Sequence, residues 1–171
     1  MILIVAGVSG SGKTTVGALL AGRLHWRFAD GDTFHPAANI AKMRAGFPLT
    51  DEDRRPWLVA ITAWMDERDA RGEPAVVTCS ALKREYRAEL LDGRPEAQMI
   101  FLSVDKAEAD RRMAARTGHF FPEQLLSSQF AALEPPEPGE PGVTVVASDK
   151  MDPEETVAAI IAIMPTGEGA S

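Results

Sequence analysis

The sequence predicts an α/β fold in which helices flank a five-stranded parallel sheet. Two observations carry this prediction. Short apolar runs alternate with longer segments of helical periodicity, as in chains that alternate strands with crossover helices. The first apolar run, ILIVA, has the aliphatic and β-branched residues of a strand covered on both faces, and a glycine-rich loop and a helical segment follow it directly.

The apolar runs and periodic segments place the individual elements. We predict strands at Ile2–Ala6, in a short segment ending at Asp30, and at Ala75–Cys79, Gln98–Val104 and Val143–Ala147. We predict helices from Lys13 onward, at Ala37–Arg44, through WLVAITAWMDERDARG, at Lys83–Leu91, Lys106–Arg116 and Pro153–Met164, and in a second segment after Gly118. A lid is expected at about residues 117–135 and a disordered tail at about 165–171.

The start of the long helix stays open at this stage. Thr50 and Asp53 have the spacing of a capped N-terminus, whereas Pro56 favours a start at the proline itself. Trp57 and Trp64 lie on the apolar stripe of this helix and are interpreted as core residues.

The composition indicates a single globular domain over residues 1–171. The chain is 45% hydrophobic, and its formal charge of −7 argues against a general nucleic-acid binder. Cys79 is the single cysteine, which excludes an internal disulfide, and its place in the run AVVTC predicts a buried structural thiol. No apolar run approaches the ~18 residues of a membrane span and no basic segment precedes the first strand, so we expect a cytoplasmic protein without a cleaved signal.

Residues Gly7 to Thr14 spell G-x-x-x-x-G-K-T, the pattern of a phosphate-binding loop (P-loop). Its glycines allow successive N–H groups to point at phosphate oxygens, and the following helix adds the positive end of its dipole. Lys13 is placed to reach the β- and γ-phosphates, and the Thr14 hydroxyl is placed to ligate Mg²⁺. The pattern therefore predicts a nucleotide site; the alternative is a glycine-rich turn that binds nothing.

Asp30 and Asp32, in the segment DGD, follow the second strand. Two carboxylates one residue apart point to the same side of an extended chain, here beside the P-loop. One could hold the water shell of a metal while the other accepts a proton from an attacking hydroxyl. An acidic turn is the alternative.

Three arginines are candidates for binding anions. Arg112 and Arg116 lie four residues apart on one face of a predicted helix, and with the following hairpin they suit a lid that closes over a nucleotide. A surface hairpin with solvated arginines is the alternative. Arg54 follows TDED, and the residues alone leave open whether it binds a substrate carboxylate or belongs to a solvated helix start.

Five segments in combination resemble the gluconokinase family of P-loop small-molecule kinases. They are GVSGSGKTT, DGDTFHP, NIAKMRAGFPLTDEDRRPWL, CSALKREYR and GHFFPEQLLSSQFAALEPP, in the family's order and spacing. The P-loop alone specifies little beyond a nucleotide, whereas the other segments are specific together. The resemblance covers Ile2 to about Met164 and implies the P-loop kinase fold, which shikimate and nucleoside monophosphate kinases share.

The resemblance also implies a reaction, namely ATP-dependent phosphorylation of D-gluconate on its C6 hydroxyl, with Mg²⁺, to give 6-phosphogluconate and ADP. It implies nucleotide binding by Gly7, Val8, Ser9, Gly10, Ser11, Gly12, Lys13, Thr14, Thr15 and Arg112, with adenine against Arg112 and the loop ASDKMDP. It implies catalytic roles for Lys13, Asp32, Arg112 and Arg116, with Asp32 as the proton acceptor. It implies metal binding by Thr14 and, through water, Asp30. It implies sugar-acid binding by Asp32, His35, Arg54, Lys83, His119 and Gln129, with Arg54 the first choice for the carboxylate. The family is commonly dimeric, so a homodimer is expected.

Two other functions compete at this stage. A shikimate or nucleoside monophosphate kinase would share the P-loop, the acid pair and the lid, but it would not explain the blocks DEDRRPWL and CSALKREYR. A nucleotide-binding switch such as a small GTPase would need a guanine-reading N-K-x-D segment, and SDK at Ser148 is a poor partial match.

Overall fold

The computed structural model describes residues 1–116 and 123–165 and contains one five-stranded parallel sheet. The strands run in the spatial order β2-β3-β1-β4-β5. Their bounds are β1 Ile2–Ala6, β2 Arg27–Ala29, β3 Ala75–Cys79, β4 Ala97–Ser103 and β5 Val143–Ala147. The predicted fold class and strands are confirmed, with β4 beginning and ending one residue earlier than expected and β2 ending at Ala29 rather than Asp30.

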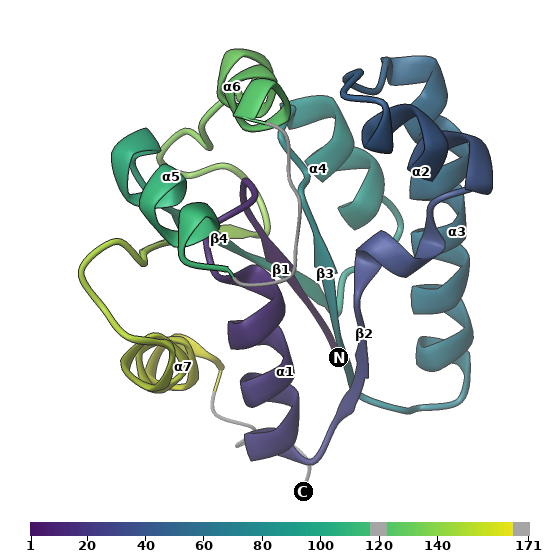
Figure 1. Cartoon of the computed structure of the whole chain (residues 1–171). Coiled ribbons are helices and arrows are strands. Elements are labelled where there is room, and N and C mark those ends of the chain that lie inside the picture. Colours follow the sequence, from purple (N-terminus) through teal and green to yellow (C-terminus); the bar gives the residue numbers. More distant parts are fainter. Residues whose placement is uncertain (117–122, 166–171) are drawn as a thin grey trace, which may run out of the picture.

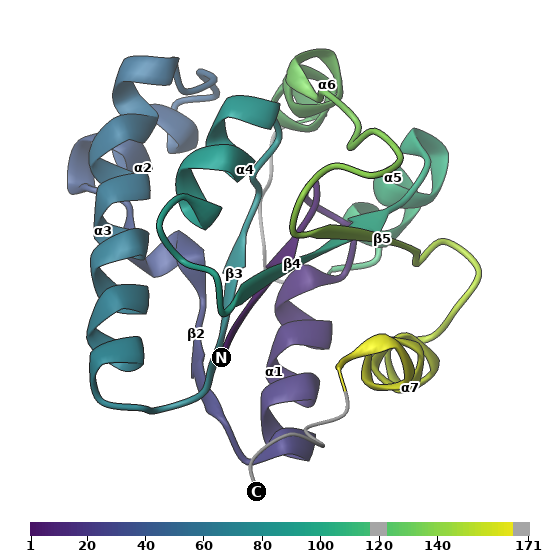
Figure 2. The same ribbon diagram turned by 180° about the vertical axis from the view of Figure 1, so that it is seen from behind.

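Helices cover both faces of the sheet (Figures 1 and 2). In β1, Ile2 and Ile4 face the side covered by α3 (Asp51–Ala70) and α4 (Arg84–Leu91). Leu3 and Val5 face the opposite side, which α1 (Lys13–Leu24) and α7 (Pro153–Ile163) cover. Every residue of β1 and β3 is buried, as a central parallel strand requires.

Three further helices lie at the end of the sheet where β1 and β3 finish, at the top of Figure 1: α2 (Ala37–Arg44), α5 (Lys106–Ala114) and α6 (Glu123–Ala132). A short 3₁₀ helix, η1 (Gly31–Phe34), follows β2 at the same end. Ligands of open α/β sheets bind outside the carboxyl ends of the strands. The architecture therefore gathers the loops that carry the predicted site at one end of the molecule.

The long helix α3 begins at Asp51 and runs through Pro56. Thr50 Oγ1 accepts a hydrogen bond from the Asp53 N–H over 3.2 Å, and Asp53 Oδ2 accepts one from the Thr50 N–H over 2.8 Å. This reciprocal capping box fixes the first turn, and Pro56 in the second turn removes only one helical donor. The boundary that the sequence left open is thus set by the cap.

Several helix bounds differ from expectation. Helix α5 ends at Ala114 rather than Arg116, α4 begins at Arg84 with Lys83 as its N-cap, and α7 ends at Ile163. The expected lid is described only from residue 123, where α6 begins, and the expected tail lies outside the described residues apart from residue 165.

Two ionisable side chains, those of Cys79 and Arg87, are buried in the interior. Cys79 is 1% exposed, and burial raises the pKa of its thiol to about 12, which confirms the predicted buried thiol. Arg87, also 1% exposed, forms a bidentate ion pair with Glu140 and donates to the main-chain oxygens of Ala81, Leu82 and Glu134. This pair anchors the proline-rich segment before β5 to the loop before α4.

Within the described residues, no helix is long and apolar enough to cross a membrane.

Candidate active site

The P-loop connects β1 to α1 and curls tightly at its glycines. Gly10 and Gly12 have φ angles of 82° and 91°, in the left-handed region that favours glycine. A Cβ at Gly10 would lie 2.7 Å from the main-chain oxygen of Ala109, so the loop also needs glycine to pack against α5. The sequence pattern thus reflects both the curl of the backbone and its close contact with α5.

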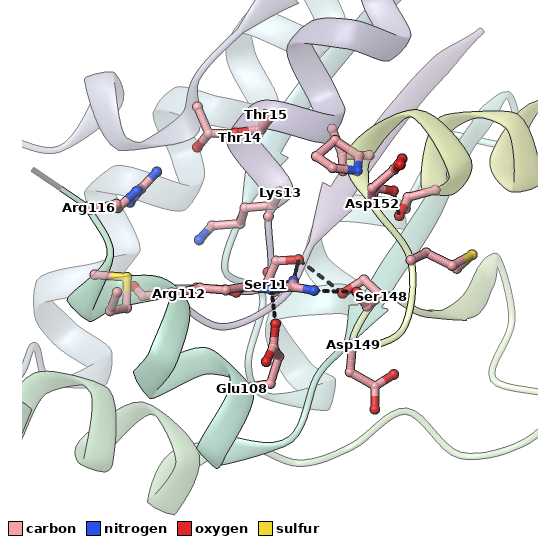
Figure 3. Close-up of a pocket in the computed structure, with 18 of the residues that line it drawn as sticks. Ser11, Lys13, Thr14, Thr15, Glu108, Arg112, Arg116, Ser148, Asp149 and Asp152 are labelled. Carbon is pink, nitrogen blue, oxygen red and sulfur yellow. Dashed lines mark hydrogen bonds and ion pairs between the residues drawn. The ribbon is translucent and has the colours of Figure 1, made fainter.

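A cavity of about 650 Å³ opens between the P-loop, α5 and the loop before α7 (Figure 3). Its walls include Ser9, Gly10, Ser11, Gly12, Lys13, Thr14, Thr15, Asp32, Glu108, Arg112, Arg116, Ser148 and Asp149. The size suits a nucleotide. Of the nucleotide-binding residues expected from the sequence, Gly7 and Val8 are buried and are absent from the walls.

Lys13 is the P-loop cation that lines this cavity. Its side chain is 9% exposed, and Nζ lies 3.5 Å from the main-chain oxygen of Val8, so the ammonium group lies along the P-loop. Thr14 and Asp32 line the same space. Among the described residues, no group of three or more His, Cys, Asp or Glu side chains could hold a metal. A Mg²⁺ ion here would therefore take most of its ligands from phosphate and water, which is its usual preference. Of the two residues expected to hold the ion, Thr14 lines the cavity and Asp30 does not, so Asp30 could act only through water.

Arg112 lies between the P-loop and the loop before α7. Its Nη2 donates to the main-chain oxygen of Ser148 over 2.5 Å, its Nη1 to that of Ser11 over 3.3 Å, and its Nε to Glu108 Oε1 over 2.8 Å (Figure 3). Hydrogen bonds from Arg111 and Arg112 lower the pKa of Glu108 to about 2, so this carboxylate stays ionised and orients the guanidinium. Arg116 also lines the cavity, although it follows the end of the helix.

The acid pair does not lie on an extended chain as expected. Asp30 is extended, but the chain turns at once into η1, and Asp30 Oδ1 accepts the N–H of Asp32 over 3.0 Å. Thr78, in β3, donates its hydroxyl to Asp30 Oδ1 over 3.1 Å and accepts the Gly31 N–H over 3.0 Å. Trp57 Nε1 donates to the Gly31 oxygen over 2.7 Å. The turn is stabilised because the Gly31 N–H, the Gly31 oxygen and the Asp32 N–H each find a partner there, and it leaves Asp32 on the cavity wall.

His35 follows η1 and stacks on Trp57, with ring centroids 4.4 Å apart. Burial lowers the pKa of its imidazole, with the positive charge of Arg54 adding to this effect and the negative charge of Asp32 opposing it. Asn39 Nδ2 donates to the Asp53 oxygen over 2.8 Å and lies 3.3 Å from His35 Nδ1. His35 is therefore neutral near pH 7, with Nδ1 as acceptor and Nε2 carrying the proton.

A second cavity of about 270 Å³ lies between the start of α3 and the start of α4. Arg54, Lys83, Asp51 and Tyr86 line it. Lys83 Nζ donates to Asp51 Oδ1 over 2.8 Å, the Tyr86 hydroxyl donates to the same oxygen, and the Arg54 guanidinium lies 5.8 Å from the Tyr86 ring centroid. These bonds lower the pKa of Asp51 and raise the pKa of Lys83. Two of the residues expected to bind the sugar acid thus share one cationic cavity.

The remaining expected sugar contacts are Gln129 and His119. Gln129, on α6, contacts the P-loop at Ser9 and is absent from the walls of the second cavity. His119 lies outside the described residues.

Sequence reasoning missed four residues at this end of the sheet: Asp51, Trp57 in its polar role, Thr78 and Glu108. Glu108 carried a signal, its i,i+4 spacing from Arg112. Thr78 and Trp57 carried none, because their partners in the DGD turn lie 26 or more residues away in the chain. Asp51 lies 32 residues from Lys83 in the chain, so no local signal in the sequence marks this ion pair either.

Comparisons with known proteins identify the family. A family model described as an AAA domain matches residues 2–136. Gluconokinase from Gluconobacter oxydans (strain 621H) is 48% identical over 84% of this chain and 80% of its own length. Thermoresistant gluconokinase from Escherichia coli (strain K12) is 41% identical over 98% and 95%, respectively. The chain belongs to the gluconokinase family.

The structural comparison agrees with this membership. The crystal structure of a gluconokinase from Sinorhizobium meliloti 1021 superposes with a TM-score of 0.82 and 44% sequence identity, covering 94% of this chain and 89% of that one. This is the family that the five sequence segments resemble, so the expected family and its P-loop kinase fold are both confirmed. Membership also removes the two competing functions, a shikimate or nucleotide kinase and a nucleotide-binding switch.

Proposed function

We propose that this protein transfers the γ-phosphoryl group of ATP to the C6 hydroxyl of D-gluconate, giving 6-phosphogluconate and ADP. One observation carries the proposal beyond family membership. The P-loop cavity has Asp32 on its wall, the cationic cavity has Arg54, and His35 lies close enough to both charges for each to change its pKa. These placements support a nucleotide site in the larger cavity and an anion site in the smaller one, with His35 near a charged residue of each.

We assign the nucleotide to the larger cavity. The P-loop N–H groups and Lys13 would hold the phosphates, and Arg112 with the loop around Ser148 would hold the adenine. Thr14, together with Asp30 through water, would hold Mg²⁺, which neutralises phosphate charge when bound. The Arg112 N–H groups already donate to Glu108 and to main-chain oxygens, so they are less available to the transferred phosphoryl group, which favours a role for Arg112 in nucleotide binding. We therefore assign the neutralisation of charge on the transferred phosphoryl group to Lys13 and Arg116.

We assign Asp32 as the group that orients the C6 hydroxyl and takes its proton. In the step, the hydroxyl O–H bond breaks and its proton passes to the Asp32 carboxylate, while the oxygen forms a bond to the γ-phosphorus and the bond from that phosphorus to ADP breaks. The cavity wall around Asp32 is fixed by the Thr78 and Trp57 contacts, which suits a base that must hold one geometry.

We assign the sugar-acid carboxylate to Arg54 and Lys83. Guanidinium and ammonium groups in one cavity match the charge of a carboxylate. In the structure, the Asp51 carboxylate accepts a hydrogen bond from the Lys83 ammonium, as a substrate carboxylate would. The His35 Nε2 proton is a further donor for a sugar hydroxyl. The homodimer and the cytoplasmic location remain predictions.

The deciding experiment is a coupled ADP-release assay with ATP and Mg²⁺, run against D-gluconate, shikimate and a panel of nucleoside monophosphates. We expect strong turnover with gluconate alone. Turnover only with another acceptor would keep the nucleotide assignments and overturn those of Arg54 and Lys83. No turnover with any acceptor would overturn the proposal as a whole.

A further inference from the structure

Helix α6 contacts the P-loop through a single amide side chain. The Ser9 main-chain N–H donates to Gln129 Oε1 over 2.8 Å, and Gln129 Nε2 donates to Ser9 Oγ over 3.0 Å. The two residues are 120 positions apart in the chain, and both bonds are partly buried. One side chain therefore makes two hydrogen bonds to one residue of the loop.

The chemistry of these groups fixes the direction of both bonds. A main-chain N–H can only donate, so the amide oxygen of Gln129 must face it and the amide NH₂ must face Ser9 Oγ. An amide NH₂ can also only donate, so Ser9 Oγ acts as the acceptor in the second bond. The single proton of the Ser9 hydroxyl is not used in this contact and is left to donate to a third group.

The place of Ser9 indicates what that third group is. Ser9 lines the nucleotide cavity and directly follows Val8, whose oxygen lies 3.5 Å from the Lys13 ammonium. Asp32 lines the same cavity. Ser9 thus belongs to the end where Lys13 would meet the β- and γ-phosphates, whereas Ser148 and Arg112 form the part assigned to adenine.

We infer that Gln129 is a positioning residue that orients the Ser9 hydroxyl to donate a hydrogen bond to a non-bridging oxygen of the phosphoryl group being transferred. The inference rests on the proposed phosphoryl transfer. Ser9 keeps its proton throughout, so no bond forms or breaks at this residue. A donor held in place before the reaction stabilises charge at that oxygen without having to reorient, and α6 supplies the hold.

A double-mutant cycle tests the inference through the direction of the hydroxyl. Ser9→Ala removes the donor, and we expect kcat to fall by about tenfold to a hundredfold, the range for a hydrogen bond to a charged group. Gln129→Glu keeps the side-chain shape, but a carboxylate accepts from both partners, so the Ser9 hydroxyl must then turn its proton towards it. We expect kcat to fall in this variant as well, with KM for gluconate nearly unchanged.

The added charge of Gln129→Glu is separated from the hydroxyl effect by repeating the change in the Ser9→Ala background. The charge persists there and the hydroxyl is gone, so we expect the loss in kcat from Gln129→Glu to be about tenfold smaller than in the parent. Equal losses in the two backgrounds would overturn the inference. Near-normal kcat in the Ser9→Ala variant would also overturn the inference. This outcome can be measured even if Gln129→Glu does not fold.

Gln124→Glu is the matched control, because it makes the same chemical change at an exposed position of the same helix. We expect its kcat and KM to equal those of the parent protein. The parent protein itself separates the two proposals. Absence of gluconate turnover in the parent would count against the proposed function, whereas a parent that turns over and variants without coupling would count against the role of Gln129 alone.

Discussion

At the scale of single residues, Asp32 is the carboxylate on which the chemistry depends. Replacing Asp32 by Asn keeps the shape and removes the proton acceptor, so we expect kcat to fall by about 10²- to 10⁴-fold, the usual contribution of a positioned base. The affinity for ATP should stay close to that of the parent, since the P-loop contacts are untouched. Steady-state kinetics with an ATP-binding titration checks both, and near-normal kcat would exclude Asp32 as the base.

Arg54 belongs to the acceptor cavity, and its replacement should affect one substrate far more than the other. We expect Arg54→Ala to raise KM for gluconate by about ten- to a hundredfold, the loss of a hydrogen-bonded charged contact, with KM for ATP little changed. Arg55→Ala is the control, because Arg55 is exposed and absent from the cavity walls. Equal increases in both KM values would indicate a structural role for Arg54.

Sequence reasoning found the site residues whose partners lie nearby in the chain, and it missed those whose partners lie far away in the chain. The geometry of the P-loop can be predicted from its pattern, because its glycines and Lys13 lie within eight consecutive positions. The Asp51 to Lys83 pair and the Thr78 contact with the DGD turn join separate segments, and nothing local marks them. The expected extended DGD was wrong for the same reason, since Thr78 and Trp57 stabilise the turn from elsewhere in the chain.

At the scale of elements, α3 helps to hold the DGD turn through Trp57. The ring is 1% exposed and its Nε1 donates to the Gly31 oxygen over 2.7 Å. Trp57→Phe keeps an aromatic ring but leaves that oxygen unpaired, so we expect a loss of about 1–3 kcal/mol in the free energy of unfolding. We expect kcat to fall as well, because Asp32 loses part of its support.

Urea unfolding and steady-state kinetics on the same preparations check this prediction. Trp64→Phe serves as the control, since Trp64 lies on the same helix, is only partly buried and packs against Phe34 of η1 through its ring, a contact that phenylalanine can keep. The loss of kcat should be confined to the Trp57 variant. Similar kinetics in both variants would mean that the indole contact does not support the turn.

The elements themselves were largely predictable, because their signals are local. The strands follow from apolar runs, and the helices follow from periodicity and caps. The start of α3 was ambiguous because a capping box and a proline compete within seven residues, and the sequence does not state their relative strength. The end of α5 was missed by two residues, at a boundary followed closely by residues outside the described part.

At the scale of the whole molecule, ionised carboxylates tie segments together and set the response to acid. Hydrogen bonds from Lys42 and from the Thr50 N–H lower the pKa of Asp53 from 3.8 to about 2. A carboxyl group with a lower pKa in the folded state stabilises the fold above its unfolded pKa, and this stabilisation is lost as the pH falls towards the folded pKa. We therefore expect the Asp53 contribution to disappear between about pH 4 and pH 2.

Comparing Asp53→Asn with the parent by urea unfolding across this range checks the prediction. The variant should be less stable than the parent at about pH 6, and the difference should shrink as the pH falls through 4 towards 2. A difference that stays constant with pH would show that Asp53 acts through packing or a neutral hydrogen bond rather than through its charge.

Helix α6 contacts both halves of the site, since Gln129 binds the P-loop and Ala132 lines the cavity of Arg54. Two ligands that bias the position of one element are thermodynamically linked, and the linkage is reciprocal. If bound nucleotide strengthens gluconate binding by some factor through α6, gluconate strengthens nucleotide binding by that same factor. Substrate synergism in equilibrium binding, reduced equally in both directions when Gln129 is replaced, would be the signature of such a shared helix.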